Sequence, residues 1–540
     1  MDGMPGRRVR SVRRVFPTHR SQTVTVTKLS IADASVARFA ACGAIWFYDK
    51  AHGSNANEPI VFERLESALS ETLNDYPHYA GQLQWATKEL VQNDINPRHV
   101  GRPAVTYGAS DDPGVELLIV EDSRELSTLV PSLEERATSK KIWNASGLPQ
   151  SDFLPSTKLA FSNLAEYKGL PGVAAQLTAF RCGGFAVSLK LTHCLSDAVC
   201  LLQFAHAWAS RSGRLFDAGR AGKLGMEHVQ PKAVFDPYWL DVHANLNARE
   251  TEPNAKRIGR ARSLPMHRFD WWATDAPGYP SWATASSNAT KPPPGELLQT
   301  QLSPSTHPPW LTWDLGAPVE HMQIRFSAAE VARMKATAVN TLPGDLQDQQ
   351  VSRQDAVVAH LWILVNRARQ LKNLDPDEHV YIDISLGMRT RVSPPLPDSF
   401  VGSPIFLAYI SKTGSDAAAA TIGAIAGSIR QMMSRFTPQA VSDYLYDAAH
   451  EVSPQRLWQA FLGSKHMLVT SWARARAYEV NFCGTESLAR YVQPDMPRLD
   501  GLLQLMDIAD TGDFDASLAL EKNTMQQLLQ DPMLRAYEEP

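Results

Sequence analysis

The chain has 540 residues, 44% of them hydrophobic and 20% charged, and a formal net charge of −4 at pH 7. This composition excludes disorder along the whole chain and leaves room for roughly two to four domains of about 150 residues. The small net charge predicts no general attraction to nucleic acid or to an anionic membrane. The five cysteines contain no C-x-x-C pair, which indicates a reducing, cytoplasmic protein without a disulfide framework or a zinc site.

The N-terminal segment is the compositional exception, and we expect a basic N-terminal arm over residues 1–23. The first twenty residues contain six arginines and a single acidic residue. Transit peptides are also rich in arginine and poor in acids, so a targeting segment is one interpretation. A short solvated arm is favoured, because only one serine is present and the apolar face is thin. No apolar run of about 18 residues, long enough to cross a membrane, occurs in the chain.

Strand-like and helix-like runs alternate from 24 to 215 and again from 321 to 540. Between them, proline, serine and threonine are dense from about 248 to 312, which disfavours a regular helix or a central strand. We therefore expect an α/β protein with an N-terminal lobe over 24–215, a crossover linker over 216–320 and a C-terminal lobe over 321–540. The pair Trp271-Trp272 either anchors this linker or lines a pocket for a bulky apolar ligand.

Three elements can be placed from the pattern of residues alone. A helix is predicted over 62–77, where leucines recur at helical spacing before Pro77. A largely buried helix is predicted over 352–369, where Ser352 and Asp355 nearly match a capping box. A strand is predicted over 184–193, because its side chains alternate after a glycine-containing turn.

One motif, H-x-x-x-D, lies where this strand meets the next helix-like run, in LTHCLSDAVC (191–200). His193 is expected at the strand end, and Asp197 in the first turn of the helix. Side chains at such junctions face clefts in α/β proteins, and a neutral imidazole there can take a proton from a bound hydroxyl. Asp197 could instead cap the helix, since carboxylates are favoured at helix N-termini. The motif alone leaves both interpretations open.

Further segments carry a family resemblance. The chain resembles the BAHD acyl-CoA-dependent acyltransferases, particularly fungal members such as trichothecene 3-O-acetyltransferases. In the HCLSDA motif, Ala198 stands where the family has glycine. The other matching segments, in chain order, are LSIAD (29–33), AIWFY (44–48), LESALSETLNDYPHYAGQL (65–83), DAVVAHLWILVNRAR (355–369), GMRTRVSPPLPDSFVGSP (387–404) and the C-terminal stretch 501–531.

The resemblance implies two similar mixed-sheet lobes, as in chloramphenicol acetyltransferase, with a solvent channel between them. It implies that His193 is the general base, reached by the acceptor from one side and by acyl-CoA, the co-substrate, from the other. The match to Asp197 faces away from the substrate and pairs with an arginine, here Arg389 or Arg391. A buried carboxylate needs such a partner. No bound cofactor and no metal are expected.

The resemblance also suggests roles for residues outside the motif. Ser352, Ser471 and Trp472 correspond to positions near the CoA channel, and Trp46 to a region that contributes to the acceptor pocket. The family's second signature, D-F-G-W-G, is altered here to Asn481-Phe482-Cys483-Gly484-Thr485. Asn481 keeps the size of the family's aspartate but loses its charge. An arginine that pairs with this aspartate in the family, where the motif supports the channel, would therefore lack its partner here.

We therefore expect acyl transfer, most simply of an acetyl group, from CoA to a hydroxyl of a small fungal-type secondary metabolite. The transfer is direct, and no G-x-S-x-G nucleophile elbow occurs in the chain. Because both lobes enclose the channel, a monomer suffices. One alternative is a condensation-like enzyme using a carrier protein, disfavoured because Thr192 stands where such domains have a second histidine. The other is a degenerate, non-catalytic binding protein, suggested by the altered second signature.

Overall fold

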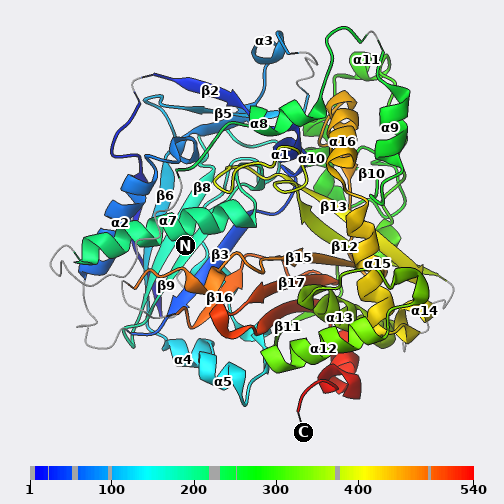
Figure 1. Ribbon diagram of the computed structural model, residues 1–540. Helices are drawn as coiled ribbons and strands as arrows, with labels where there is room; N and C mark the ends of the chain where they lie inside the picture. The colour runs from blue at the N-terminus through cyan, green and yellow to red at the C-terminus, as the bar shows by residue number, and fades with distance from the viewer. Residues whose placement is uncertain are drawn as a thin grey trace.

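The computed structural model has two large mixed β-sheets, each covered by helices (Figure 1). It describes residues 6–21, 23–50, 59–94, 100–217, 232–250, 252–370, 378–483 and 488–539. The architecture is the α/β, two-lobe arrangement that the sequence predicts. Outside the segments described below, short helices are α1 (Ile31–Ser35), α3 (Lys88–Val91), α4 (Leu126–Leu129), α5 (Leu133–Ala137), α6 (Gln150–Phe153), α8 (Tyr238–Asp241), α10 (Thr284–Ala289) and α11 (Pro294–Leu297).

The N-terminal sheet has six strands, mostly antiparallel, with β6 and β8 parallel. Helices α2 (Pro59–Thr72) and α7 (Ala198–Asp217) lie side by side across it (Figure 1). The indole N–H of Trp208 donates to the Leu65 carbonyl at 2.8 Å, which joins the two helices. In spatial order the strands are β1 (Arg7–Val15), β6 (Val115–Asp122), β8 (Val173–Phe180), β9 (Phe185–Leu191), β3 (Cys42–Tyr48) and β16 (Tyr491–Pro494).

The C-terminal sheet has seven strands, with parallel pairing of β12 with β15 and of β15 with β17. Its central helix is α13 (Arg353–Gln370), whose Trp362 is fully buried. Neighbouring helices are α12 (Ala328–Asn340), α14 (Gly414–Ala419), α15 (Ile422–Ser434) and α17 (Lys522–Gln530). In spatial order the strands are β13 (Ile405–Thr413), β12 (His379–Gly387), β15 (His466–Ser471), β17 (Leu502–Asp507), β18 (Phe514–Glu521), β11 (Val319–Phe326) and β7 (Ile142–Asn144).

The proline-rich segment packs onto the sheets. Helix α9 (Ala255–Arg262) lies along α16 (Pro438–His450), and β10 (Phe269–Asp270) pairs with β14 (Leu457–Trp458). An aromatic cluster anchors this segment, as one of the two interpretations of Trp271-Trp272 requires. The tryptophans of the cluster are Trp271, Trp272, Trp310, Trp313 and Trp458. A separate three-stranded sheet has the order β2 (Thr25–Lys28), β5 (Pro103–Tyr107), β4 (Gln82–Trp85).

Each large sheet contains one strand from the other half of the chain. β16 pairs with β3 in the N-terminal sheet, with Val492 opposite Trp46. β7 pairs with β11 in the C-terminal sheet, with Trp143 opposite Gln323. Both strands cross the boundaries expected for the lobes, and those boundaries remain predictions.

The elements predicted from sequence agree with the structure except at the N-terminus. The predicted helices correspond to α2 and α13, and the predicted strand to β9. A solvated arm is wrong for Arg7–Val15, because β1 pairs along its length with β6. β1 is an edge strand, so its backbone pairs with β6 on one side only. Most of its arginine side chains remain exposed to solvent. Within the described ranges, no helix is long and apolar enough to cross a membrane.

Candidate active site

A cavity of about 560 Å³ is lined by both halves of the chain and contains the H-x-x-x-D motif. This volume lies in the range of small-molecule sites. The N-terminal half contributes residues of 38–43, 161–164 and 193–199, and later segments contribute residues of 385–407 and 458–502. The cavity therefore depends on how the two sheets are joined.

His193 begins a short 3-10 turn directly after β9, which carries its side chain to the cavity wall. The edge of the imidazole meets the ring of Phe39, with ring centroids 5.3 Å apart. Burial lowers the pKa of His193, and a hydrogen bond to its own backbone carbonyl and the charge of Asp197 oppose this shift only in part. The imidazole is therefore neutral at pH 7, as a general base must be.

The hydroxyl of Ser403 contacts the ring and can accept from or donate to it, so it is compatible with either tautomer. Nδ1 lies 3.1 Å from Oγ of Ser403, on the loop before β13. An Nδ1–H that donates to oxygen leaves the lone pair on Nε2. In that tautomer, Nε2 is the ring nitrogen that can accept a proton.

Asp197 lies at the cavity, but its carboxylate is engaged by protein groups. Its carboxylate accepts two hydrogen bonds from the Arg389 guanidinium, at 2.6 and 3.1 Å. It also accepts from the backbone N–H of Cys200 at 3.0 Å and so caps α7. Of the two arginines proposed, Arg389 is the partner, whereas Arg391 donates to the Gly387 carbonyl. Capping and ion pairing occur together, and both hold the loop that carries His193.

Ser403 and Asp33 are supporting residues that the sequence analysis missed. Asp33 accepts from the backbone N–H of Ser403 at 2.5 Å and from Ser30 Oγ at 2.6 Å. Burial raises the pKa of Asp33 to about 6. Gly402 lies against it: a Cβ there would be 2.9 Å from the Asp33 carboxylate, at a φ of +151°. The available signals were the S-x-x-D capping box at Ser30 and the position of Ser403 at the end of a family segment.

The residues predicted on the CoA side fall into two groups. Ser471 and Trp472, at the end of β15, line the cavity. Ser352 instead caps α13: its Oγ accepts from the Asp355 backbone N–H at 3.2 Å, and its own backbone N–H donates to the Asp355 carboxylate at 2.6 Å. Ser352 is not part of the cavity lining. Asn481 is half-buried and accepts from the Cys483 backbone N–H at 3.0 Å. Gly484 and Thr485 of the altered signature lie outside the described residues.

The burial of Trp46 contradicts its predicted place in the acceptor pocket. Its side chain is fully buried, and its indole N–H donates to the Ala477 carbonyl at 2.9 Å. Only the first residues of β3, Cys42 and Gly43, line the cavity, whereas Trp46 lies further along the strand and is not part of the lining. Aromatic lining comes instead from Trp271, Trp282, Trp313 and Trp458. Trp271 thus serves both suggested roles, anchoring the linker and lining a pocket.

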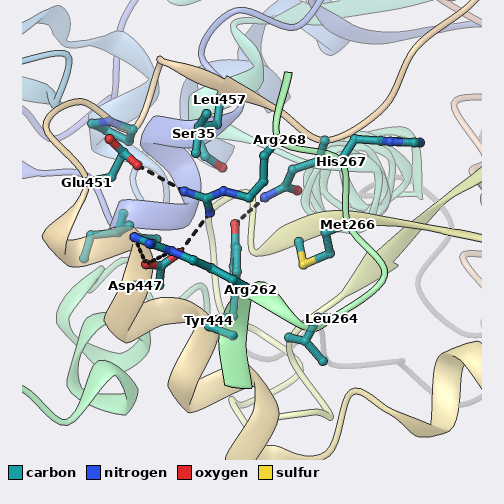
Figure 2. A pocket seen from close by; sticks show the side chains of 15 residues that line it. Ser35, Arg262, Leu264, Met266, His267, Arg268, Tyr444, Asp447, Glu451 and Leu457 are labelled. Atoms are coloured by element: carbon teal, nitrogen blue, oxygen red, sulfur yellow. Dashed lines mark hydrogen bonds and ion pairs between the residues drawn. The ribbon is translucent and has the colours of Figure 1, made fainter. Parts of the chain in front are cut away.

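A second, smaller cavity of about 50 Å³ lies beside α16 (Figure 2). Its arginines are paired with carboxylates: Arg268 with Asp447 at 2.9 Å and with Glu451, and Arg262 with Asp447 at 2.9 Å (Figure 2). The charges around this cavity are therefore compensated within the protein.

Next to this small cavity, the fold brings together His267, Asp383 and His466, whose potential ligand atoms lie within 4.8 Å of one another. No motif signals this triad, because its members are far apart in the sequence. His466 Nδ1 lies 2.9 Å from Asp383, a direct hydrogen bond that needs no ion. The triad ties the linker to β12 and β15.

Comparison with known proteins agrees with this geometry. Residues 8–140, 150–232 and 296–534 match the model of the Transferase family. Acyltransferase AFT15-1 of Alternaria alternata is 25% identical over 465 residues, covering 86% of this chain and 82% of that protein. Acyltransferase abl6 of Leptosphaeria maculans is 25% identical over 543 residues, covering 97% of each chain.

Among solved structures, F. graminearum TRI101, complexed with coenzyme A and deoxynivalenol, has the same fold. It superposes with a TM-score of 0.65 at 14% identity, covering 95% of this chain and 99% of that one. The family match extends over well more than half of the chain and includes the motif and most of both sheets. The chain therefore belongs to the Transferase family, the family of the BAHD acyltransferases.

Proposed function

We propose that this protein transfers an acyl group, most simply acetyl, from acyl-CoA to a hydroxyl of a small secondary metabolite. The observation that carries the proposal is the neutral imidazole of His193 on the wall of a 560 Å³ cavity, held by Ser403 and the Asp197–Arg389 pair. The fungal relatives named acyltransferases support the reaction class. The TRI101 complex, with coenzyme A and deoxynivalenol bound to a protein of this fold, supports the two substrates.

The reaction is a direct transfer. Nε2 of His193 accepts the proton of the acceptor hydroxyl while the oxygen attacks the thioester carbonyl carbon. The tetrahedral intermediate collapses by breaking its C–S bond, and the CoA thiolate takes the proton from the imidazolium. Hydroxyls of Ser385, Thr470 and Ser471 line the same cavity and are available to donate to the oxyanion. Asp197 is a positioning residue, because its carboxylate is bonded to Arg389 and not to the ring.

The donor is acyl-CoA rather than a carrier-protein thioester. Where condensation domains have a second histidine, Thr192 is buried and donates through Oγ1 to the Ala160 carbonyl at 2.8 Å. We assign Ser471 and Trp472 to the donor side of the cavity, and Ser352 and Asn481 to its more distant support. One chain contains both walls of the cavity, so we propose a monomer, to be checked by light scattering.

The proposal is tested by release of free thiol from acetyl-CoA with a panel of polyketide and terpenoid alcohols. Wild type should give acceptor-dependent release, and His193→Ala should reduce it about 10²- to 10⁴-fold. His379→Ala, which removes an exposed histidine at the start of β12, is the matched control and should retain activity. The proposal fails if no acceptor gives release and calorimetry detects no binding of acetyl-CoA.

A further inference from the structure

The cavity contains an arginine whose charge is not compensated by an acidic side chain. Arg38 follows α1 and lines the same cavity as His193. Its Nε donates to the Gln455 carbonyl at 2.9 Å, and Nη2 donates to Thr290 Oγ1 at 2.7 Å. Its guanidinium carbon lies over the ring of Trp271, 5.1 Å from the centroid. These partners orient the guanidinium, but each of them is neutral.

Other arginines around the two cavities differ in this respect. Arg389 is paired with Asp197, and the arginines of the smaller cavity are paired with Asp447 and Glu451 (Figure 2). No carboxylate of the described residues forms an ion pair with Arg38 within 4.0 Å. Burial lowers the pKa of Arg38 to about 10, and the acidic group acting on it is only the phenol of Tyr279. A desolvated cation of this kind is stabilised when an anion binds.

The carboxylates that line the cavity are engaged elsewhere. Asp197 is bonded to Arg389, and Asp495 accepts from the Gln150 side chain at 3.0 Å and is influenced by the charge of Lys190. The anion that would complete the environment of Arg38 must therefore come from a ligand. Arginine presents a planar set of donors, which suits a carboxylate.

We propose that Arg38 binds a carboxylate of the acceptor, and that the acceptor is therefore a hydroxy acid with an apolar body. The inference rests on the proposed function and specifies its substrate class. Arg38 directly precedes Phe39, whose ring contacts His193, and both residues line the cavity. The Arg38 guanidinium lies over Trp271, so an anion bound there sits beside the aromatic part of the lining. Trp271, Trp282 and Trp458 supply aromatic walls for the apolar body.

Binding without any acyl donor tests this directly. Hydroxydecanoic acids with the hydroxyl at different positions are titrated into wild type by calorimetry at pH 7.5, each beside its methyl ester. At least one acid should bind about 10- to 100-fold more tightly than its ester, the range of a charged hydrogen-bonded contact. Equal binding of every acid and ester, or preference for an amine analogue, would overturn the proposal.

Variants assign the preference to Arg38. Arg38→Met should abolish the difference between acid and ester, and Arg38→Lys should retain part of it, provided both unfold at the wild-type temperature. Lys291→Met is the matched control: Lys291 is close enough for its charge to act on that of Arg38 but does not line the cavity. The acid preference should persist in that variant.

The donor is measured separately, so failure of this inference differs from failure of the proposed function. Acetyl-CoA should bind Arg38→Met as tightly as it binds wild type. Weaker binding of acetyl-CoA, with an unchanged acid preference, would assign Arg38 to the donor and refute the inference. Thiol release with neutral alcohols, together with no acid preference, would leave acyl transfer standing and remove only the hydroxy-acid acceptor.

Discussion

Asp197→Asn should destabilise the protein and slow catalysis without removing the base. Asparagine keeps the shape of the side chain and an oxygen for the Cys200 cap, but it turns one acceptor facing Arg389 into a donor. The Arg389 side chain is only 11% exposed, so its charge would remain buried without a partner. Breaking one side of a buried pair costs about 3–5 kcal/mol, a large part of the 5–15 kcal/mol typical of folded proteins.

A second substitution measures how much of this destabilisation comes from the interaction between Asp197 and Arg389. Arg389→Met alone leaves the Asp197 carboxylate buried, whereas the double variant Asp197→Asn/Arg389→Met removes both charges. We expect the double variant to be less destabilised than the sum of the single variants, by about 2 kcal/mol or more. Unfolding midpoints in urea, followed by tryptophan fluorescence, measure this coupling.

Kinetic measurements distinguish a loss of protein stability from a loss of His193 positioning. Asp197→Asn should lower kcat, because the His193 loop loses its anchor, while the KM for acetyl-CoA changes little. Asp513→Asn is the matched control, since Asp513 forms a similar ion pair with Arg325 at 2.7 Å outside the cavity lining. The control should lose stability but keep kcat. Wild-type kcat and unfolding midpoint in Asp197→Asn would refute the assigned role.

Three further substitutions and one pH profile of the wild type test other parts of the structure. Ser403→Ala should lower kcat about tenfold and alter the ¹⁵N shifts of the His193 imidazole, with Ser403→Thr restoring both; unchanged shifts would exclude the tautomer role. In wild type, kcat/KM should fall only below about pH 6.5, because burial lowers the pKa of His193. His78→Leu should stabilise the protein, because both ring nitrogens are buried without hydrogen-bond partners. Burial lowers the pKa of His78 to about 3, so between pH 6.5 and 3 the unfolded chain takes up a proton that the folded chain does not. The gain in unfolding free energy should therefore be larger at pH 5 than at pH 8, by about 2 kcal/mol; an equal gain at both pH values would contradict this. Trp46→Phe should lower the free energy of unfolding by about 1–2 kcal/mol, because it leaves the Ala477 carbonyl unpaired, and the KM for the acceptor should not change. A raised KM would indicate that Trp46 contacts the acceptor.

The motif could be predicted from sequence because its signals are local. A period of two ends near Leu191 and a helical pattern begins within a few residues, so the positions of His193 and Asp197 follow from neighbouring residues alone. The arginine partner, almost 200 residues later, could be narrowed to two candidates only through the family resemblance. The structure selects Arg389, because that side chain reaches the Asp197 carboxylate.

The residues that were missed or misplaced depend on contacts between distant segments. Asp33 and Ser403 are 370 positions apart, and nothing near either residue signals the other. Trp46 lies in a strand buried on both faces, so no alternation of polar and apolar residues shows where its side chain points. The arginines of β1 suggested a solvated segment, because composition reports side-chain exposure and not backbone pairing.

Because β7 and β16 are exchanged, each half of the chain supplies one strand to the sheet of the other half. Removing residues beyond the linker would take β16 from β3 and leave a central strand of the first sheet as a bare edge. Removing the first 150 residues would likewise expose β11 by taking away β7. Each half alone would therefore leave one strand of its sheet with an unpaired edge, so the protein should fold as one cooperative unit. Fragments cut in the linker should be recovered only when both are produced together.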